Sequence, residues 1–209
     1  MERFAQHDNF LTQDALAALQ AYFQSQVTWT FGWQSNKKNA EVPFSHWNHD
    51  FLGAGSNNQT DLADQLLADP ALAPIAALWT QLHTRLLPGH ALVRCYANAH
   101  TFGIEGYPHT DSRKPGNITT IFYINPQWKP EWAGETVFLN DLGDIAHAVL
   151  PRPGRAVVFD GTIIHSARAV TRLCPTPGSL KSPRHRQASW CAWLCTRDRA
   201  WQRAMCLRC

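Results

Sequence analysis

Residues 107–125, YPHTDSRKPGNITTIFYIN, place a histidine and an aspartate two positions apart, followed by a Gly/Pro turn and an apolar run. Side chains at positions i and i+2 of a strand point to the same face, so His109 and Asp111 are expected to converge on one point. Both are metal-ligand types, but two residues do not complete a metal site. The rest of the chain must supply a third ligand.

That ligand is expected from VVFDGTIIHSARAV (157–170), a second strand-like segment that contains His165. Two histidines and one carboxylate on one face leave open coordination positions, an arrangement typical of Fe(II) that binds a co-substrate and oxygen together. The sequence therefore predicts a metal site of His109, Asp111 and His165. An isolated H-x-D is also common as a surface pair, so the distal histidine carries much of this interpretation.

Seven short strand-like segments follow residue 90, separated by Gly, Pro or Asn turns with no helix between them. Strands at such close spacing are typical of an antiparallel sandwich or barrel of jelly-roll type. The segments are residues 91–97, 118–125, 135–140, 146–151, 155–161, 162–170 and 187–195.

The N-terminal part is expected to be helical and rich in aromatic residues. Residues 11–26 have apolar side chains at helical spacing after Thr12, which can cap the helix. Residues 60–89 predict one or two further helices, broken near Pro70 and Pro74. The fold class expected is mainly β with flanking helices.

The 209 residues, 44% apolar and 17% charged, suit one domain with a substantial core. We divide it into N-terminal support (1–90), a β core (91–197) and a C-terminal tail (198–209). A net charge of +3 gives no reason to expect nucleic acid as a partner. No apolar run reaches the ~18 residues of a membrane span, and the start lacks a signal core, so a cytoplasmic protein is expected. Neither the oligomeric state nor a role for Cys206 and Cys209 follows from the sequence.

Residues 94–141 and 151–171 resemble the prolyl 4-hydroxylase-like branch of the Fe(II)/2-oxoglutarate-dependent dioxygenases, and the likeness extends over roughly residues 92–195. The motifs that carry it are Arg94-Cys95-Tyr96, the H-x-D pair, Tyr123-Ile124-Asn125 with Trp128, PRPGRAVVF (151–159), and His165 with Val170-Thr171. One departure is Gly134-Glu135, where the family has two glycines.

The resemblance implies a double-stranded β-helix (jelly-roll) core braced by the N-terminal helices. It also implies Fe(II), with 2-oxoglutarate and O2 as co-substrates, and no catalytic residue beyond the iron site. Tyr123 and Tyr96 are then expected to contact 2-oxoglutarate. The family's basic residue for the distal carboxylate aligns with Arg186, at the start of RQASWCAWL (186–194). Arg184 and Arg172 remain alternatives, because a loop is inserted before Arg186.

The activity implied is oxidative decarboxylation of 2-oxoglutarate to succinate, coupled to hydroxylation of a substrate C–H bond. A small polar organic substrate is the first expectation, and a peptidyl-prolyl or other protein side-chain substrate is the alternative. A non-catalytic β-sandwich binding module and a zinc hydrolase are the readings from other classes.

The aromatic stretch before residue 52 is the part of the chain where the resemblance fades. Its density of Trp, His and Asn in FSHWNHDF (44–51) exceeds what a connector between helices needs. We therefore expect Trp47 and His49 to line the substrate entrance. The other reading is that the tryptophans of the chain, among them Trp29 and Trp132, are core or structural residues.

Overall fold

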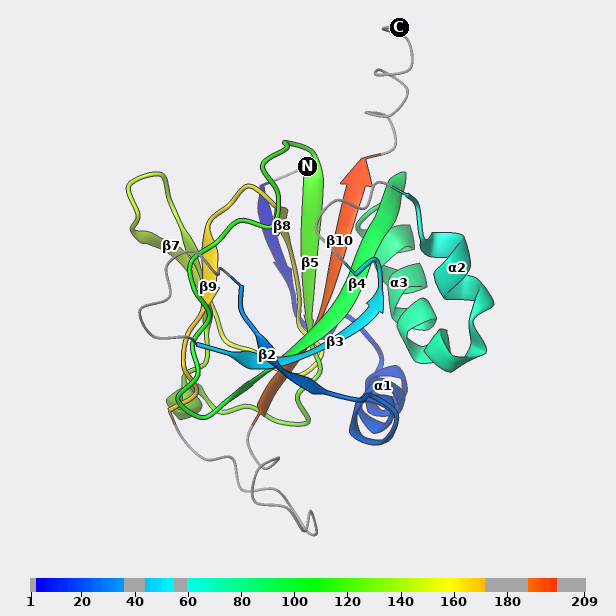
Figure 1. The fold of residues 1–209 in the computed structure, drawn as a ribbon, viewed down its shortest axis with the longest axis horizontal. Coiled ribbons are helices and arrows are strands. Elements are labelled where there is room, and N and C mark those ends of the chain that lie inside the picture. Colours follow the sequence, from blue (N-terminus) through cyan, green and yellow to red (C-terminus); the bar gives the residue numbers. More distant parts are fainter. Residues whose placement is uncertain (1–2, 36–43, 55–59, 172–187, 199–209) are drawn as a thin grey trace, which may run out of the picture.

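The computed structural model describes residues 3–35, 44–54, 60–171 and, for the backbone, 188–198. Two antiparallel β-sheets pack face to face, and helices cover the outer face of the larger one (Figure 1). Within the described residues the larger sheet has seven strands in the order β1-β8-β5-β10-β4-β3-β2, and the smaller has three in the order β7-β6-β9. The fold is mainly β with flanking helices, as expected.

The strands are β1 (Phe4–His7), β2 (Thr30–Trp33), β3 (His46–Leu52), β4 (His90–Thr101), β5 (Asn117–Tyr123), β6 (Thr136–Leu139), β7 (Ile145–Val149), β8 (Ala156–Asp160), β9 (His165–Ala167) and β10 (Ala188–Asp198). The helices are α1 (Gln13–Ser25), α2 (Ala63–Ala68) and α3 (Ala73–Arg85), with 3-10 turns at Pro70–Leu72 and Pro130–Trp132. Each of the seven segments predicted after residue 90 contains one strand.

The helices form where the sequence predicts them. The Thr12 hydroxyl accepts a hydrogen bond of 3.3 Å from the Ala15 N–H, which satisfies one of the unpaired N–H groups at the start of α1. Proline starts the 3-10 turn after α2 and occupies the first turn of α3, because its fixed φ fits helix starts but not helix interiors. The break predicted near Pro70 and Pro74 is therefore confirmed.

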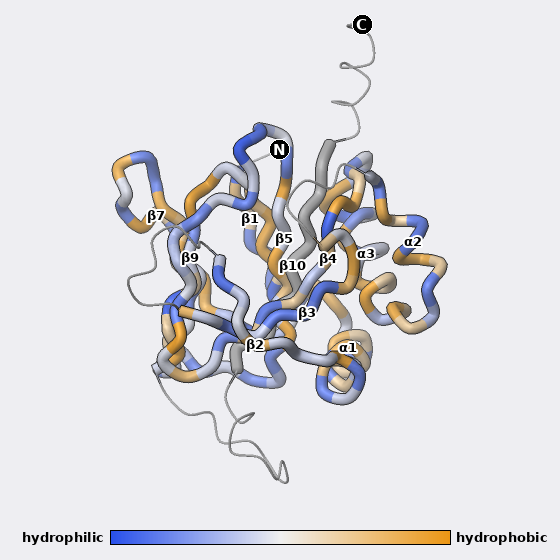
Figure 2. Tube along the Cα trace, viewed as in Figure 1, coloured by the Kyte–Doolittle hydropathy of each residue, from blue (hydrophilic) through white to orange (hydrophobic). Residues whose placement is uncertain are grey.

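The large sheet separates two cores. On its helix side, buried residues of α1, α3, β4, β5 and β8 form one cluster, which includes Phe23, Leu82 and Phe122. A second cluster lies between the sheets and joins Tyr123 and Phe159 of the large sheet to Phe138 of β6. Figure 2 shows hydrophobic residues along α1 and α3, whereas β3 is largely hydrophilic.

The N-terminal part contributes strands to the large sheet as well as helices. β1 pairs with β8 at one edge of the large sheet, and β3 and β2 extend the other edge beyond β4. β1 is only four residues long, so its sequence pattern is too short to detect. β3, HWNHDFL, has three consecutive polar residues at positions 48–50 and so lacks the apolar alternation that identifies a half-buried strand.

The turn before β6 explains the departure at Gly134-Glu135. Gly134 has φ +79°, and a Cβ there would lie 2.9 Å from the Trp128 ring, so only glycine fits. Glu135 is not among the residues with positive φ, and its backbone carbonyl accepts a hydrogen bond of 2.8 Å from the Arg168 N–H. A side chain at the second position is therefore compatible with this turn.

Candidate metal centre and co-substrate site

The segment that carries the H-x-D pair crosses between the sheets and pairs with β9. The His109 N–H donates to the His165 carbonyl at 3.0 Å, and the His165 N–H donates back to the His109 carbonyl at 2.9 Å. This reciprocal pair brings residues far apart in sequence side by side. The expectation that H-x-D lies on a regular strand is wrong, because His109 forms an isolated bridge and Asp111 sits in the bend that follows.

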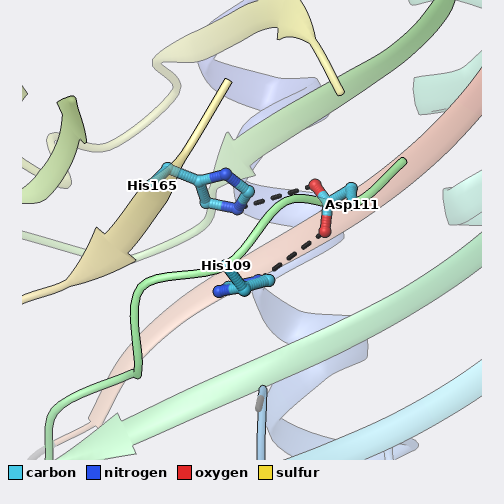
Figure 3. A group of neighbouring side chains, drawn as sticks. All are labelled: His109, Asp111 and His165. Atoms are coloured by element: carbon cyan, nitrogen blue, oxygen red, sulfur yellow. Dashed lines mark ion pairs between the residues drawn. The ribbon is translucent and has the colours of Figure 1, made fainter. Parts of the chain in front are cut away.

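The structure brings the three predicted ligand residues together (Figure 3). His109 Nε2 lies 3.7 Å from Asp111 Oδ1, and His165 Nε2 lies 3.6 Å from Asp111 Oδ2. One ligand atom from each residue lies within 4.8 Å of the other two. The carboxylate lies beside the two rings with one oxygen toward each Nε2, so an ion at the centre of the group is within reach of all three residues (Figure 3).

Backbone carbonyls orient both imidazoles. His109 Nδ1 lies 2.7 Å from the Tyr107 carbonyl, and His165 Nδ1 lies 3.0 Å from the Ile163 carbonyl. A carbonyl only accepts, so Nδ1 carries the proton in each ring and Nε2 keeps its lone pair. Metal-binding histidines are held in the same way, with one nitrogen donating to the backbone and the other facing the metal.

The environment of the group fits a metal ion. Asp111 Oδ2 is buried and makes no hydrogen bond within the described residues, and its 3.6 Å contact with His165 is too long for one. Burial lowers the pKa of His165, partly opposed by the Asp111 carboxylate, so the ring is presented in its neutral, ligating form. A buried carboxylate without donors is costly unless a cation meets it.

Aromatic residues fix His165 from behind. Its ring lies 4.8 Å from Phe159 and 5.9 Å from Phe138, both fully buried between the sheets. Such packing restricts the ring to one rotamer and lowers the dielectric around the group. A site held this firmly keeps its ligand geometry without help from the ion.

Both tyrosines expected at the co-substrate site face the space between the sheets. The Tyr123 hydroxyl donates a hydrogen bond of 2.8 Å to Thr136 Oγ1, and both residues are buried. Arg94 lies 4.1 Å over the Tyr96 ring and forms an ion pair of 3.3 Å with Asp50. Arg94 is thus a cation on this face that already has a carboxylate.

Arg186, predicted to bind the distal carboxylate of 2-oxoglutarate, lies outside the described residues, as do Arg184 and Arg172. The backbone of β10 begins two residues after Arg186, and Ala188 pairs with Thr101 at the end of β4. The choice between the arginines therefore remains a sequence-based prediction. The C-terminal Cys206 and Cys209 also lie outside the described part.

A second pair of histidines, not predicted from the sequence, lies beside the triad. His46 of β3 and His100 of β4 stack with ring centroids 4.4 Å apart, and both are buried. Burial lowers the pKa of His46 to about 2, with further lowering by His100 and His109 and partial compensation from Asn98. Burial likewise lowers the pKa of His100 to about 4, and His109 adds to the shift. Both rings are neutral near pH 7.

Two asparagines continue this polar row on the same strands. Asn48 Nδ2 donates to Asn98 Oδ1 at 3.0 Å and approaches the Ala97 carbonyl at 3.2 Å. Both side chains are almost fully buried. A signal was present in the sequence: polar residues alternate along 46–50 and 94–100, but alternation of polar residues alone does not show that they are buried.

The expectation that Trp47 and His49 line the substrate entrance is wrong for His49. Its Nδ1 lies 2.7 Å from the Thr28 carbonyl and its ring contacts Phe51, which packs against the helix-side core. Trp47, two positions before His49, lies on the same face of β3, and its ring centroid is 5.1 Å from that of Phe31. Because successive strand residues alternate faces, His46 and Asn48 face the triad instead.

Four further tryptophans, Trp29, Trp33, Trp128 and Trp132, divide between the two readings. Trp29 packs against the helix-side core, and Trp132 is buried beside Trp128 with ring centroids 5.5 Å apart. Trp33 lies on the triad side, 5.4 Å from the Arg94 guanidinium. Three of these four are therefore structural residues away from the metal group, and Trp33 borders the site.

Comparison with known proteins places this site in a family. Residues 93–191 match the model of the 2OG-Fe(II) oxygenase superfamily, and this range contains the whole triad. A search of curated proteins finds no match. No helix within the described residues is long and apolar enough to cross a membrane.

Solved structures with a similar fold include three oxygenases. A prolyl hydroxylase from Trichoplax adhaerens, in complex with a peptide of the hypoxia inducible factor oxygen degradation domain, matches with TM-score 0.64 and 15% identity over 96% of this chain and 87% of its own. A prolyl-4-hydroxylase from Pseudomonas putida matches with TM-score 0.55 and 17% identity, over 94% of this chain and 93% of its own. An oxidoreductase of the 2OG-Fe(II) oxygenase family from Burkholderia pseudomallei matches with TM-score 0.60 and 12% identity, over 94% of this chain and 86% of its own.

These structures share the architecture of this chain, and at identities of 12–17% they support the fold alone. The family match adds the chemistry, since it spans the residues that form the His/Asp/His group. Fe(II), 2-oxoglutarate and O2 are the cofactor and co-substrates of this family. Residues 93–191 resemble the 2OG-Fe(II) oxygenase superfamily, and the protein is a 2-oxoglutarate-dependent dioxygenase similar in fold to the prolyl hydroxylases.

Proposed function

We propose that His109, Asp111 and His165 hold the Fe(II) ion, in a core that is a double-stranded β-helix. The support is the shared orientation of the three side chains: both Nε2 atoms and the carboxylate converge, while both Nδ1 atoms are committed to backbone carbonyls. Three protein ligands on one side leave the other side open, as reactions with a chelating co-substrate and oxygen require.

In the same proposal, 2-oxoglutarate lies between the sheets against Tyr123 and Tyr96, with its distal carboxylate on Arg186. The Tyr123 hydroxyl is held at the end of β5 by Thr136, and because both hydroxyls can donate and accept, the Tyr123 proton can turn to an anion while Thr136 becomes the donor. Arg94, on the same face, is neutralised by Asp50. A further cation is needed, and an arginine suits because its planar fork binds a carboxylate with two hydrogen bonds.

Iron and 2-oxoglutarate supply the oxidising chemistry when bound, and the chain's own residues position and protect the reacting groups. Phe138 and Phe159 exclude water behind His165. The Tyr107 and Ile163 carbonyls orient the two imidazoles so that each Nε2 faces the other ligand residues. The substrate must then present one C–H bond to the open side of the metal, so specificity lies in the side chains that border that side.

The substrate that this border favours is a small polar organic molecule, hydroxylated at a C–H bond. The observation that carries this proposal is the buried polar row beside the triad, formed by His46, Asn48, Asn98 and His100. Polar groups buried in this way favour a ligand with hydrogen-bonding groups, because an apolar one leaves them without partners.

The second candidate is a peptidyl-prolyl substrate, and the fold comparisons favour it. The Trichoplax adhaerens enzyme, similar over almost the whole chain, is described in complex with a peptide fragment. The peptide backbone is itself rich in amides and also suits a polar row. The two candidates differ in size and in whether a flanking chain is required.

Succinate formation tests these proposals together. Iron-loaded protein is supplied with 2-oxoglutarate and either small polar molecules, including free amino acids and sugars, or proline-containing peptides. Succinate above the substrate-free rate, with a product heavier by one oxygen, identifies the class. Stimulation by peptides alone overturns the small-molecule proposal, and failure of the protein to bind Fe(II) overturns the triad.

A further inference from the structure

The stacked His46–His100 pair has hydrogen-bonding capacity that the fold does not use. His46 is 1% exposed and His100 5%, yet within the described residues Nδ1 of His100 has no hydrogen-bond partner. The two nitrogens of His46 have only the neighbouring Asn98 side chain, which partly offsets the lowering of the His46 pKa and makes no hydrogen bond of full geometry. Buried polar groups are rarely left unsatisfied, and those that are point to a ligand, water or ion. Both stacked rings therefore have unused hydrogen-bonding capacity beside the metal group.

The position of the pair connects it to the reaction. His100 lies beside Gly106, and the Gly106 N–H donates at 2.9 Å to the carbonyl of Ala167 on β9, the strand that begins with His165. Neither ring of the pair belongs to the His109/Asp111/His165 group. Their strands pair directly, with Asn48 opposite Asn98, which fixes both imidazoles on a rigid part of the large sheet.

The chemistry of the two rings narrows what can bind. A neutral imidazole has one N–H donor and one nitrogen acceptor. His100 makes a backbone hydrogen bond with Ile104, which favours its protonated form, so the ring donates there and its Nδ1 is left as an acceptor. With His46, the pair therefore offers a donor and acceptors within two rings stacked 4.4 Å apart. One planar group with both an acceptor oxygen and a donor N–H can reach both rings.

We propose that His46 and His100 form a positioning subsite that holds an uncharged amide group of the substrate beside the iron. The proposal rests on the proposed iron site and deepens it by naming the substrate chemistry. The amide oxygen accepts from the imidazole N–H, and the amide N–H donates to an unprotonated ring nitrogen. The neighbouring carboxamides of Asn48 and Asn98 already pair in this manner.

Charged groups fit this subsite less well. A carboxylate cannot donate to the acceptor nitrogens, and Arg94, the cation that the described residues place on this face, is already paired with Asp50 at 3.3 Å. An ammonium group would have to compete with the metal ion for Asp111, the carboxylate of the triad. Burying an unpaired charge costs more than burying an amide whose hydrogen bonds are satisfied.

The test measures amide binding directly and needs no knowledge of the natural substrate. Full-length protein is loaded with 2-oxoglutarate and with Zn(II) in place of Fe(II), so that NMR signals remain narrow. The imidazole ¹⁵N resonances of His46 and His100, assigned with the variants His46→Phe and His100→Phe, are followed during titration with acetamide, N-methylacetamide or acetate. The phenyl ring keeps the stack and removes only the nitrogens.

At least one amide is expected to shift both sets of resonances in a saturable manner, with an affinity at least about tenfold above that of acetate. Tighter binding of acetamide indicates a carboxamide substituent, and tighter binding of N-methylacetamide indicates a peptide bond. His46→Phe is expected to abolish the shifts at His100. His83→Phe, which removes a buried imidazole nitrogen from α3, is expected to leave them unchanged.

Saturable binding of acetate with equal affinity overturns the proposal, as does the absence of any amide-dependent shift in the wild-type protein. Retention of amide binding by both phenylalanine variants also overturns it. The iron site is tested separately by calorimetric titration of Zn(II) into wild type and His165→Ala. If wild type fails to bind Zn(II), the triad assignment fails, while the amide titration of the metal-free protein still decides the subsite.

Discussion

The two faces of the seven-stranded sheet are built from the same strands but carry opposite chemistry. On β4, Cys95 and Ala97 point into the apolar core under the helices. Their neighbours Tyr96, Asn98 and His100 point toward the triad. Because strand residues alternate faces, a single sequence segment supplies packing to one side and hydrogen-bonding groups to the other.

In this fold, one face of the large sheet mainly contributes stability and the other face carries the groups expected to bind metal and substrate. The helix face gains free energy by burying apolar area, at roughly 25 cal/mol per Å². The triad face instead buries imidazoles and carboxamides, some without hydrogen bonds, which reduces stability unless a metal or substrate matches them. Substitutions on the helix face are therefore expected to lower the free energy of unfolding, whereas substitutions on the triad face are expected to weaken metal or substrate binding.

The largest expected effect is loss of the metal through His165→Ala. Removal of a ligand should weaken Fe(II) binding by more than the 10- to 100-fold typical of residues that only orient ligands, and succinate formation should cease. The fold should survive, since the helix-side core is untouched. Calorimetric Fe(II) titration under anaerobic conditions, with His83→Ala as control, measures this. Full-strength Fe(II) binding by His165→Ala refutes the ligand set.

Phe122→Ala changes the opposite face of the sheet and should lower stability while leaving Fe(II) binding intact. Phe122 is fully buried in the helix-side core, and truncation of a buried phenylalanine costs about 3–5 kcal/mol. Fe(II) affinity of the folded protein should be unchanged. Urea unfolding of the metal-free protein gives the stability. A loss of Fe(II) affinity matching that of His165→Ala would show that the two faces are not independent.

Arg186→Ala separates the arginines that the sequence leaves open. Loss of a charge-assisted contact with 2-oxoglutarate should cost about 2–4 kcal/mol, or roughly 30- to 1000-fold in co-substrate affinity. Arg184→Ala, its matched control, should cost much less, because Arg186 aligns with the family's basic residue. Binding of 2-oxoglutarate to the Zn(II)-loaded variants decides between them. A reversed order of effects makes Arg184 the anchor.

His49→Ala tests on β3 whether residues on the helix side and the triad side of one strand have different roles. The variant loses the contact of Nδ1 with the Thr28 carbonyl and should cost about 1 kcal/mol of stability. The ratio of hydroxylated product to succinate should remain normal, because the ring lies on the helix side. His46→Phe, three positions earlier, is the contrasting variant and should lower that ratio. Uncoupling by His49→Ala would restore the entrance hypothesis.

The smallest expected effect is the pH dependence that arises from Asp8 at the edge of the large sheet. A bidentate pair with Arg155, at 2.6 and 3.0 Å, lowers the pKa of Asp8 below its usual 3.8. A depressed carboxyl pKa contributes stability above the unfolded-state pKa, and that stability is lost as pH falls through the folded-state value.

Asp8 is 47% exposed, so solvent screening keeps this contribution small. Urea unfolding of wild type and Asp8→Asn should give free energies that differ above about pH 5 and converge below about pH 3. Asp141→Asn, at an exposed hairpin position, is the control. An unchanged difference at low pH means that Asp8 does not titrate through the pair.

Local patterns were sufficient for several parts of the fold and site. Helix α1 was predicted because Thr12 caps a run with apolar residues at helical spacing, both of which are local properties. The strands after residue 90 were predicted from short apolar runs between turns. His109, Asp111 and His165 could be grouped because each lies in a distinctive motif. The strand β3 was missed, since a run of polar residues looks the same for an exposed loop and for a strand that faces a site.

The resemblance to the oxygenase family, the mainly β architecture and the grouping of His109, Asp111 and His165 could be predicted from residue types and short spacings. The folded structure was needed to show that β3 joins the large sheet and that His46 and Asn48, rather than His49, face the triad. It was also needed to show that His46 stacks on His100. Strand parity and register depend on pairing across more than forty residues of chain, and no local pattern encodes the partner strand.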